Sequence, residues 1–464
     1  MLTLCLCQAS AAWAQGERTC SLELITTPGT ISHMVTLPSG ERRVDISRGV
    51  EATCGVMWVR ADSASWYEGR GILYMFGNVQ FRDPSRTLNS ERATYYQNED
   101  WVRAEGNVRL TDTAEGSTLT GPQLDYYPQN EFRLVERMYA PQRPHIVFRS
   151  GSGEAAGQAF EVDADRVHIY GDSLIAGSGN VVAVRGELNA FGDSLHFDTA
   201  LEELWLLGDP RVEAQGTNLE GDTVLVLLEA EQVREIHSWP NGSARGDGVG
   251  LAAPYLRMFV EEEEVTRTVA SAGAAERTGV VDSAGRAPWA RSESNEYILV
   301  ADSIDILRPG GSLQQVIAVQ RARANTREMV EPADSLLGTD WLVGDTITGY
   351  FTAAEASGAG QDAELERLVA SGSARALYHV RDDPAGADPA LQEAALNYVI
   401  GRIVTLQLEG GAVQGAEVIL GTGLYLEPLP AATNGDSTLV VPEVAPNDSS
   451  AVPPDTTITL GARS

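Results

Sequence analysis

Apolar and polar residues alternate along much of the chain with a period of two, the spacing at which side chains of a β-strand point to opposite faces. In the segment 73–81 one face is apolar and consists of Leu73, Met75, Val79 and Phe81. The segment 101–110 repeats this arrangement. The alternation predicts half-buried β-strands rather than helices.

The strands recur as a repeated unit. Each copy opens with a small residue and an acid, runs as an alternating strand, turns, and returns as a second strand containing Gly-Asn-Val or a variant. Three clear copies begin at Asp62, Glu91 and Asp165, and the motif's glycine follows the acid after 15, 15 and 14 residues. Further copies begin at Asp193 and Asp222 with spacings of 15 and 20 residues. The unit predicts stacked β-hairpins that bury a continuous apolar interior.

The glycine and the acid of the unit each have a structural interpretation. By its position in the alternation the glycine falls on the apolar face, where it can form a β-bulge that bends the strand around a core. The asparagine beside it tolerates the unusual backbone conformation. The acids recur as far as Asp302 and Asp345, and we interpret them as turn residues at strand starts. A calcium ladder is the alternative, but it needs Gly/Asp nonapeptides that the sequence lacks.

Composition and repeat quality divide the chain into segments. An N-terminal segment, 15–55, precedes a regular block of repeats at 56–250. An acidic, Ala- and Gly-rich stretch at 251–296 is interpreted as an insertion or linker. A looser block of repeats follows at 297–427, and the Pro-, Asp-, Ser- and Thr-rich tail at 428–464 is expected to be disordered.

The N-terminus has features of an export signal. Residues 1–14 are apolar or small and carry no charge, and the Ala-Trp-Ala that ends the segment fits a signal-peptide cleavage site, although the positively charged n-region is missing. Cleavage there would leave Cys20 and Cys54. In an exported chain these two can form one disulfide, and two free buried thiols are the alternative.

Charge and hydropathy limit the classes of partner. The formal net charge is −31, and all 34 basic residues are arginines. Such acidity disfavours nucleic-acid binding and docking on anionic lipid headgroups through charge. No later stretch approaches 18 consecutive apolar residues, so no transmembrane helix is expected. Any lipid binding has to rest on apolar contacts, on local arginines or on divalent cations.

Two strings resemble a catalytic motif. Gly-Asp-Ser-Leu occurs at 171–174 and 192–195, as in the nucleophile block of one hydrolase family. The companion Asp-x-x-His blocks, which end at His168 and His196, precede or overlap the serines instead of lying far downstream, so we assign both strings to the repeat. The two histidines are expected to stack on neighbouring strands, with no third metal ligand evident. We therefore expect no enzymatic activity, metal or cofactor.

The repeat resembles a known family. A-D-x-A-x-Y/W, a short turn, and L-x-A-x-G-N-V-x-V/L are similar to the OstA-like domain of the periplasmic lipopolysaccharide-transport bridge protein and of the outer-membrane assembly protein's N-terminus. The resemblance is best over 56–127 and 161–245 and fainter over 297–427. It implies an all-β jellyroll, an open, twisted, V-shaped stack of antiparallel strands, and the chain length suggests two in tandem.

The resemblance also implies a function. It suggests a periplasmic protein, with association to the outer membrane, that shields lipopolysaccharide acyl chains in an apolar groove and bridges the two membranes. Its partners would be lipopolysaccharide or a related amphipathic lipid, and other OstA-like jellyroll proteins joined head to tail through exposed end strands. The groove would be lined by inward residues: Ala64, Trp66, Leu73, Met75, Val79, Phe81, Tyr95, Val102, Ala104, Val108, Leu110, Val167, Ile169, Ile175, Val181, Leu195, Phe197, Leu204, Leu206, Val212, Val224 and Val226.

Periodicity alone leaves two other functions open. If side chains fill the space between the strands, the chain is a structural or adhesive exported β-solenoid without a lipid ligand. A carbohydrate-active β-helix enzyme is the third alternative, and it would gather acids in a cleft on one sheet face.

Overall fold

The computed structural model shows an all-β chain built on a large antiparallel sheet, as the alternation predicts. It divides into two compact units, up to Leu204 and from Trp205, so the division falls inside the repeat block 56–250 rather than in the stretch 251–296. The structure describes residues 23–25, 29–54, 56–113, 116–149, 159–171, 173–214, 216–229, 232–246, 248–262, 264–272, 289–327, 339–352, 363–380, 395–409, 412–427 and 457–461. The predicted signal peptide, Cys20 of the predicted disulfide and most of the tail lie outside these residues.

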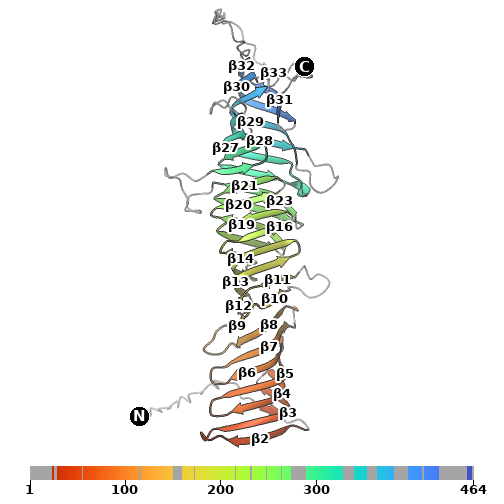
Figure 1. Cartoon of the computed structure of the whole chain (residues 1–464), viewed down its shortest axis with the longest axis vertical. Coiled ribbons are helices and arrows are strands. Elements are labelled where there is room, and N and C mark those ends of the chain that lie inside the picture. Colours follow the sequence, from red (N-terminus) through yellow and green to blue (C-terminus); the bar gives the residue numbers. More distant parts are fainter. Residues whose placement is uncertain are drawn as a thin grey trace, which may run out of the picture. The chain divides into compact units, whose positions relative to one another are not determined.

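The N-terminal unit consists of successive antiparallel strands. They are β1 (Glu23–Ile25), β2 (Ile31–Thr36), β3 (Arg42–Cys54), β4 (Met57–Tyr67), β5 (Ile72–Arg82), β6 (Arg86–Tyr96), β7 (Trp101–Asp112), β8 (Thr118–Tyr127), β9 (Arg137–Pro141), β10 (His145–Phe148), β11 (Phe160–Asp163), β12 (Arg166–Tyr170), β13 (Leu174–Arg185) and β14 (Leu188–Asp198). From β3 to β8 each strand pairs with the next along its length, as Figure 1 shows in red to orange.

The long strands bend near their middle, where two residues lie opposite one on the next strand. In β5, Gly77 and Asn78 lie opposite Glu91 of β6. Gly77 has a φ of 76° and Asn78 a φ of 45°, which is the left-handed region that glycine and asparagine adopt most readily. The same pair of positive φ angles occurs at Gly106-Asn107 and Gly179-Asn180. The β-bulge predicted from Gly-Asn-Val is confirmed.

In the three clear copies of the repeat the opening acid is bonded to the bend of the following strand. Asn78 Nδ2 donates to Asp62 Oδ2 over 2.8 Å, and Asn180 Nδ2 donates to Asp165 Oδ2 over 2.8 Å. Asn107 and Glu91 make the equivalent bond. Asp62 and Glu91 lie within β4 and β6, so for these two the interpretation as strand-entry turn residues is wrong, whereas Asp165 lies directly before β12, as interpreted. All three acids lie at the corner of the sheet, where each accepts a hydrogen bond from the bend.

The same contact recurs in the C-terminal unit, with an asparagine as donor at one acid and an arginine at another. Asn241 Nδ2 donates to Asp222 Oδ2 over 3.1 Å, and the Arg321 guanidinium donates to Asp302 over 3.0 Å. The repeated acid thus keeps its structural function where Gly-Asn-Val has been lost.

The bends divide the N-terminal unit into two leaves. Leaf A consists of residues 31–36, 42–47, 63–67, 72–76, 92–96, 101–105, 123–127, 137–141, 166–170, 174–178 and 194–198. Leaf B consists of residues 23–25, 50–54, 57–61, 79–82, 86–90, 108–112, 118–121, 145–148, 160–163, 181–185 and 188–192.

The apolar faces of the two leaves pack against each other. The ring of Phe160 on leaf B lies 5.4 Å from the ring of Phe197 on leaf A, measured between centroids, and Phe148 of leaf B lies 5.8 Å from the same ring. Such aromatic contacts bury large apolar areas. The core of this unit is therefore the layer between the leaves.

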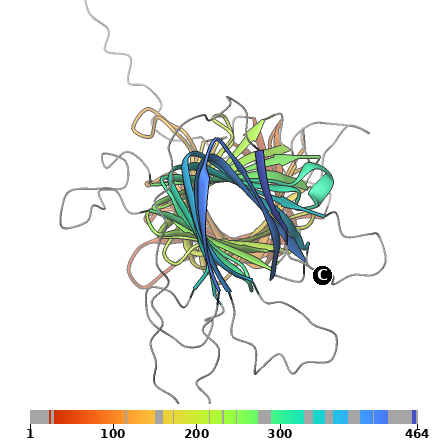
Figure 2. The same ribbon diagram turned by 90° about the horizontal axis from the view of Figure 1, so that it is seen from above.

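The C-terminal unit repeats the two-leaf arrangement with more broken strands. After β15 (Glu203–Leu207), which contains the division, come β16 (Arg211–Ala214), β17 (Thr217–Glu220), β18 (Thr223–Glu229), β19 (Gln232–Trp239), β20 (Gly242–Gly246), β21 (Val249–Ala253), β22 (Tyr255–Glu261), β23 (Glu264–Ser271), β24 (Ala290–Glu293), β25 (Tyr297–Ala301), β26 (Ser303–Leu307), the 3-10 turn η1 (Pro309–Gly311), β27 (Gln315–Thr326), β28 (Trp341–Phe351), β29 (Leu365–Val380), β30 (Ala395–Glu409), β31 (Ala412–Ile419), β32 (Thr422–Leu426) and β33 (Thr457–Gly461). Figure 2 shows the blue and teal strands of this unit on opposite sides of a central axis.

Two sequence expectations differ from this structure. The range 251–296, expected to be an insertion or linker, instead holds most of β21 and all of β22, β23 and β24; Leu256, Met258 and Val260 alternate inward there and are buried. Within 251–296 the structure describes every residue except Glu263 and residues 273–288. The expected disordered tail contains β33, which pairs with β31.

Candidate functional site

The residues predicted to line a lipid groove lie between the leaves. All but three of them are buried, many completely, as Ala104, Leu195 and Val224 are. The exceptions, Trp66, Leu110 and Ile169, are half-buried. Their own side chains therefore fill most of the interior, and an incoming chain would have to displace contacts that already exist.

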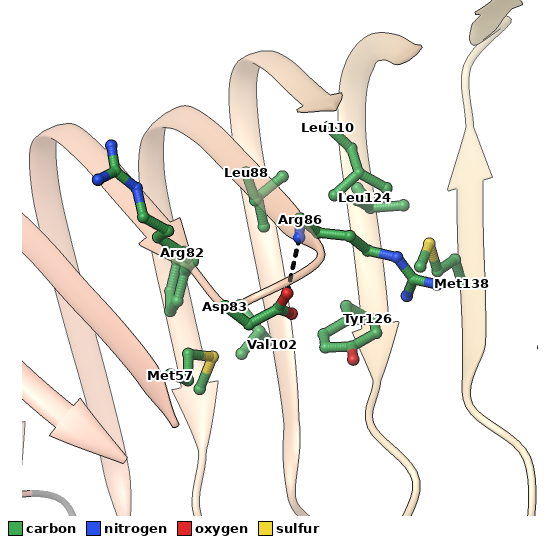
Figure 3. A pocket seen from close by; sticks show the side chains of 11 residues that line it. Met57, Arg82, Asp83, Arg86, Leu88, Val102, Leu110, Leu124, Tyr126 and Met138 are labelled. Carbon is green, nitrogen blue, oxygen red and sulfur yellow. Dashed lines mark hydrogen bonds between the residues drawn. The ribbon is translucent and has the colours of Figure 1, made fainter. Parts of the chain in front are cut away.

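One pocket interrupts this packing in the N-terminal unit. Leaf B contributes Phe81 and Leu88 to its lining, and leaf A contributes Val102 and Leu124. The complete lining is Met57, Phe81, Arg82, Asp83, Arg86, Leu88, Val102, Leu110, Leu124, Tyr126 and Met138, and Figure 3 shows the β5–β6 turn lying in front of the strands of leaf A. The cavity volume is about 30 Å³, enough for a water molecule and well below the ~150 Å³ at which an apolar cavity takes up benzene.

An ion pair beside the pocket joins one leaf to the other. Arg86 begins β6 on leaf B, and its Nη1 donates to Oε1 of Glu136, which lies next to β9 on leaf A. The Tyr126 hydroxyl donates to Glu136 Oε2 over 3.0 Å. The charged side chains are only 16% and 18% exposed, so solvent screens this pair less than an ordinary surface pair.

A second arginine joins the leaves inside the C-terminal unit. Arg308 follows β26, is buried, and donates from Nη1 to Thr217 Oγ1 over 3.1 Å and from Nη2 to the Gly246 carbonyl over 3.4 Å. β26 belongs to the leaf of β18, β19, β22 and β23, whereas Thr217 and Gly246 belong to the leaf of β17, β20, β21 and β24. Neither arginine could be recognised from the sequence, because nothing in the local pattern identifies a contact across the sheet.

An aromatic row follows the outer face of leaf A. The rings of Tyr96 and Trp101 stack with centroids 4.2 Å apart, and Trp101 stacks on Tyr127 at 5.2 Å. Arg103, on the same face, forms a double hydrogen bond with the buried carboxylate of Asp125. In the sequence, the alternation of apolar and polar residues places these side chains on the outward face, which was the sign of a row there. Their stacking shows that the row mainly stabilises the sheet.

The two histidines considered for metal binding do not lie on neighbouring strands. His168 pairs with Ala176 of β13, and Ala176 pairs with His196 of β14, so a whole strand separates the two imidazoles. The expectation that they stack on neighbouring strands is wrong. His168 instead stacks on Tyr139 at 4.6 Å, and burial, with the nearby charge of Arg166, lowers its pKa. Within the described part of the chain no three His, Cys, Asp or Glu side chains form a cluster that could hold a metal ion.

Two strands near the ends of the described sheet, β2 and β32, are exposed. In β2 all six residues are exposed, and Met34 is 65% accessible. In β32 all five residues are exposed, including Leu424 and Tyr425. Among the described strands β2 pairs with β3, and β32 pairs with β30. Each presents one unpaired edge with apolar side chains, the arrangement that favours pairing with another chain.

Comparison with known proteins gives no relative. No protein-family model matches the chain, and no curated protein matches it. Among the residues the structure describes, no helix has the length and apolar character needed to span a membrane.

We expect the N-terminal unit to lose stability in alkali. Burial, with the charge of Asp100, raises the pKa of Tyr95 from 10 to about 12, and burial with the charge of Glu136 raises the pKa of Tyr126. A group with a raised folded pKa contributes its full stabilisation below the unfolded value, here 10, and loses it as the pH rises through the folded value. Tyrosinate absorbance and circular dichroism, followed together, should show late ionisation coupled to loss of β-structure. Ionisation of every tyrosine near the ordinary value, with the sheet intact, would contradict this expectation.

Proposed function

We propose that the chain is a non-catalytic protein of the bacterial periplasm that holds acyl chains of lipopolysaccharide, or of a related amphipathic lipid, between its leaves. In this proposal each unit is an OstA-like jellyroll, and the two stand in tandem. The observation that carries it is the apolar layer between two leaves joined along bent strands, made by the same Ala-Asp and Gly-Asn-Val residues that carry the family resemblance. In a layer of this kind, contacts between side chains of the two leaves can be exchanged for contacts with the methylene groups of an acyl chain.

The energetics favour such an exchange if the leaves can part. Each methylene transferred from water contributes about 0.8 kcal/mol, so a long acyl chain offers a large total gain. Against this stand the contacts that the inward side chains already make, including the Phe160–Phe197 contact across the leaves. Lipid binding therefore requires a conformational change in which the leaves separate locally.

The exposed end strands support the bridging part of the proposal. Their free edges and apolar side chains suit strand addition by another jellyroll protein, which would join chains end to end between the inner and outer membranes.

A structural or adhesive β-solenoid is the second candidate function. The observation that favours it is the burial of nearly all inward residues, which leaves little empty space between the leaves. In that case the interior is an ordinary core, and only the end strands would take part in function.

Site-specific photocrosslinking distinguishes the two functions. A photoreactive amino acid at Met75 or Phe197 faces the interior, whereas one at Tyr74 or His196 lies on the outer face of the same strand. With lipopolysaccharide present we expect labelling at the two inward positions and little at the two outward ones. Equal labelling at both kinds of position, or none at any, contradicts lipid carriage and leaves the filled solenoid.

A further inference from the structure

We propose that the pocket beneath the β5–β6 turn is the place where an acyl chain of an anionic amphiphile enters the interior, and that the Arg86–Glu136 ion pair is its latch. This inference rests on the proposed lipid-binding function and adds to it a specific insertion site and a gate.

The two partners of the latch are each fixed to a different leaf. On leaf B, Asp83 Oδ1 accepts the backbone N–H groups of Ser85 and Arg86 over 2.8 Å and 2.7 Å, which holds the β5–β6 turn in shape. On leaf A, the carbonyl of Glu136 accepts the N–H of Gly171 over 3.0 Å, which ties the residue to the β12–β13 turn. Because each anchor is local to its own leaf, parting the leaves at this point breaks the ion pair and leaves both turns intact.

The pocket under the latch suits one aliphatic chain. Most of its lining is apolar on both leaves, and two of the lining residues, Met57 and Met138, are flexible thioethers that adapt to different shapes. At about 30 Å³ the closed pocket is too small for more than the tip of a chain. It continues into the buried layer, since Phe81, Leu88, Val102 and Leu124 also belong to the core.

The mouth of the pocket supplies the charge that an anionic headgroup needs. Arg86 belongs to the lining, and opening the latch releases its guanidinium from Glu136. Two acids near Arg86 also accept other hydrogen bonds: Asp83 from the turn N–H groups and Glu136 from the hydroxyl of Tyr126. In a chain with a net charge of −31, an arginine beside an apolar pocket gives local complementarity to a carboxylate or phosphate.

The test uses the full chain and a long-chain fatty acid with a diazirine at its methyl end, and peptide mass spectrometry locates the label. Glu136→Gln removes the ion pair and keeps Arg86, so labelling of pocket residues should be about fivefold faster than in the unmodified chain. The charge exchange Arg86→Glu with Glu136→Arg restores an ion pair and should return the rate toward the original value. The methyl ester of the same probe should gain less from Glu136→Gln, because it lacks the anionic group.

A matched control is the Arg70–Glu41 ion pair. Its atoms lie 3.0 Å apart, but Glu41 and Arg70 belong to the β2–β3 and β4–β5 turns, both at the margin of leaf A. Arg70→Gln should leave the labelling rate unchanged. Circular dichroism checks that each variant keeps its β-structure.

The outcomes separate this inference from the proposed function. If the probe labels inward residues at the same rate in Glu136→Gln and in the unmodified chain, or labels them away from the pocket, the latch is wrong and lipid carriage stands. If Arg70→Gln accelerates labelling as much as Glu136→Gln does, the effect is general loosening and the latch is again wrong. If no variant is labelled between the leaves, both the latch and the lipid-binding function fail.

Discussion

Replacing Gly106 with valine is expected to lower the free energy of unfolding of the N-terminal unit by about 3–4 kcal/mol. Gly106 has a φ of 79°, which a β-branched residue adopts only under strain. A Cβ at this position would also lie 2.6 Å from Glu91 Oε2, the carboxylate that accepts the hydrogen bond from Asn107. The substitution therefore opposes both the backbone conformation and the contact that hold one bend of the sheet.

Gly116 provides the matched control for this prediction. Its φ of 77° is nearly the same, but nothing lies within 4 Å of the position of its Cβ. Gly116→Val should cost only the backbone strain, about 1–2 kcal/mol. Urea unfolding of both variants, followed by tryptophan fluorescence and circular dichroism, measures the difference. Equal losses would show that the contact with Glu91 contributes nothing to the bend.

Lysine on an end strand is expected to weaken end-to-end association about tenfold or more. Met34 on β2 and Leu424 on β32 are exposed on strands that pair on one side only within the described residues. A charge there must lose water when a second chain adds to the edge, whereas it costs little in the free protein. Met34→Lys and Leu424→Lys should each reduce the assembly seen by analytical ultracentrifugation as protein concentration rises.

Leu134→Lys is the control for general surface hydrophobicity. Leu134 is 81% exposed, more than either edge residue, but it lies in the segment between β8 and β9 rather than on a strand edge. The substitution Leu134→Lys should therefore leave end-to-end association unchanged. A chain that stays monomeric at every concentration, or an equal loss in Leu134→Lys, is incompatible with self-association through strand addition.

The sequence by itself determined the strands, their faces and their bends. Two short-range properties allow this: side chains of a strand alternate strictly, and few residues other than glycine and asparagine accept a positive φ. Hence the strand around Leu73 and Met75, and the bulge at Gly77-Asn78, could be predicted from the local sequence alone. The strands of 251–296 were missed because an acidic, Ala- and Gly-rich composition masked the alternation of Leu256, Met258 and Val260.

Only the tertiary structure decided what the repeated acids bind and which residues meet across the interior. Asp62 and Asn78 are bonded although 16 residues separate them, because the pairing of β4 with β5 brings both to the same bend. Arg86 reaches Glu136 across 50 residues, because the bends fold one leaf over the other. Periodicity places an inward residue on a face but does not give the distance to the opposite face, so it could not show that the interior is nearly full. The candidate site depends on that distance, which the folding of the bent sheet sets.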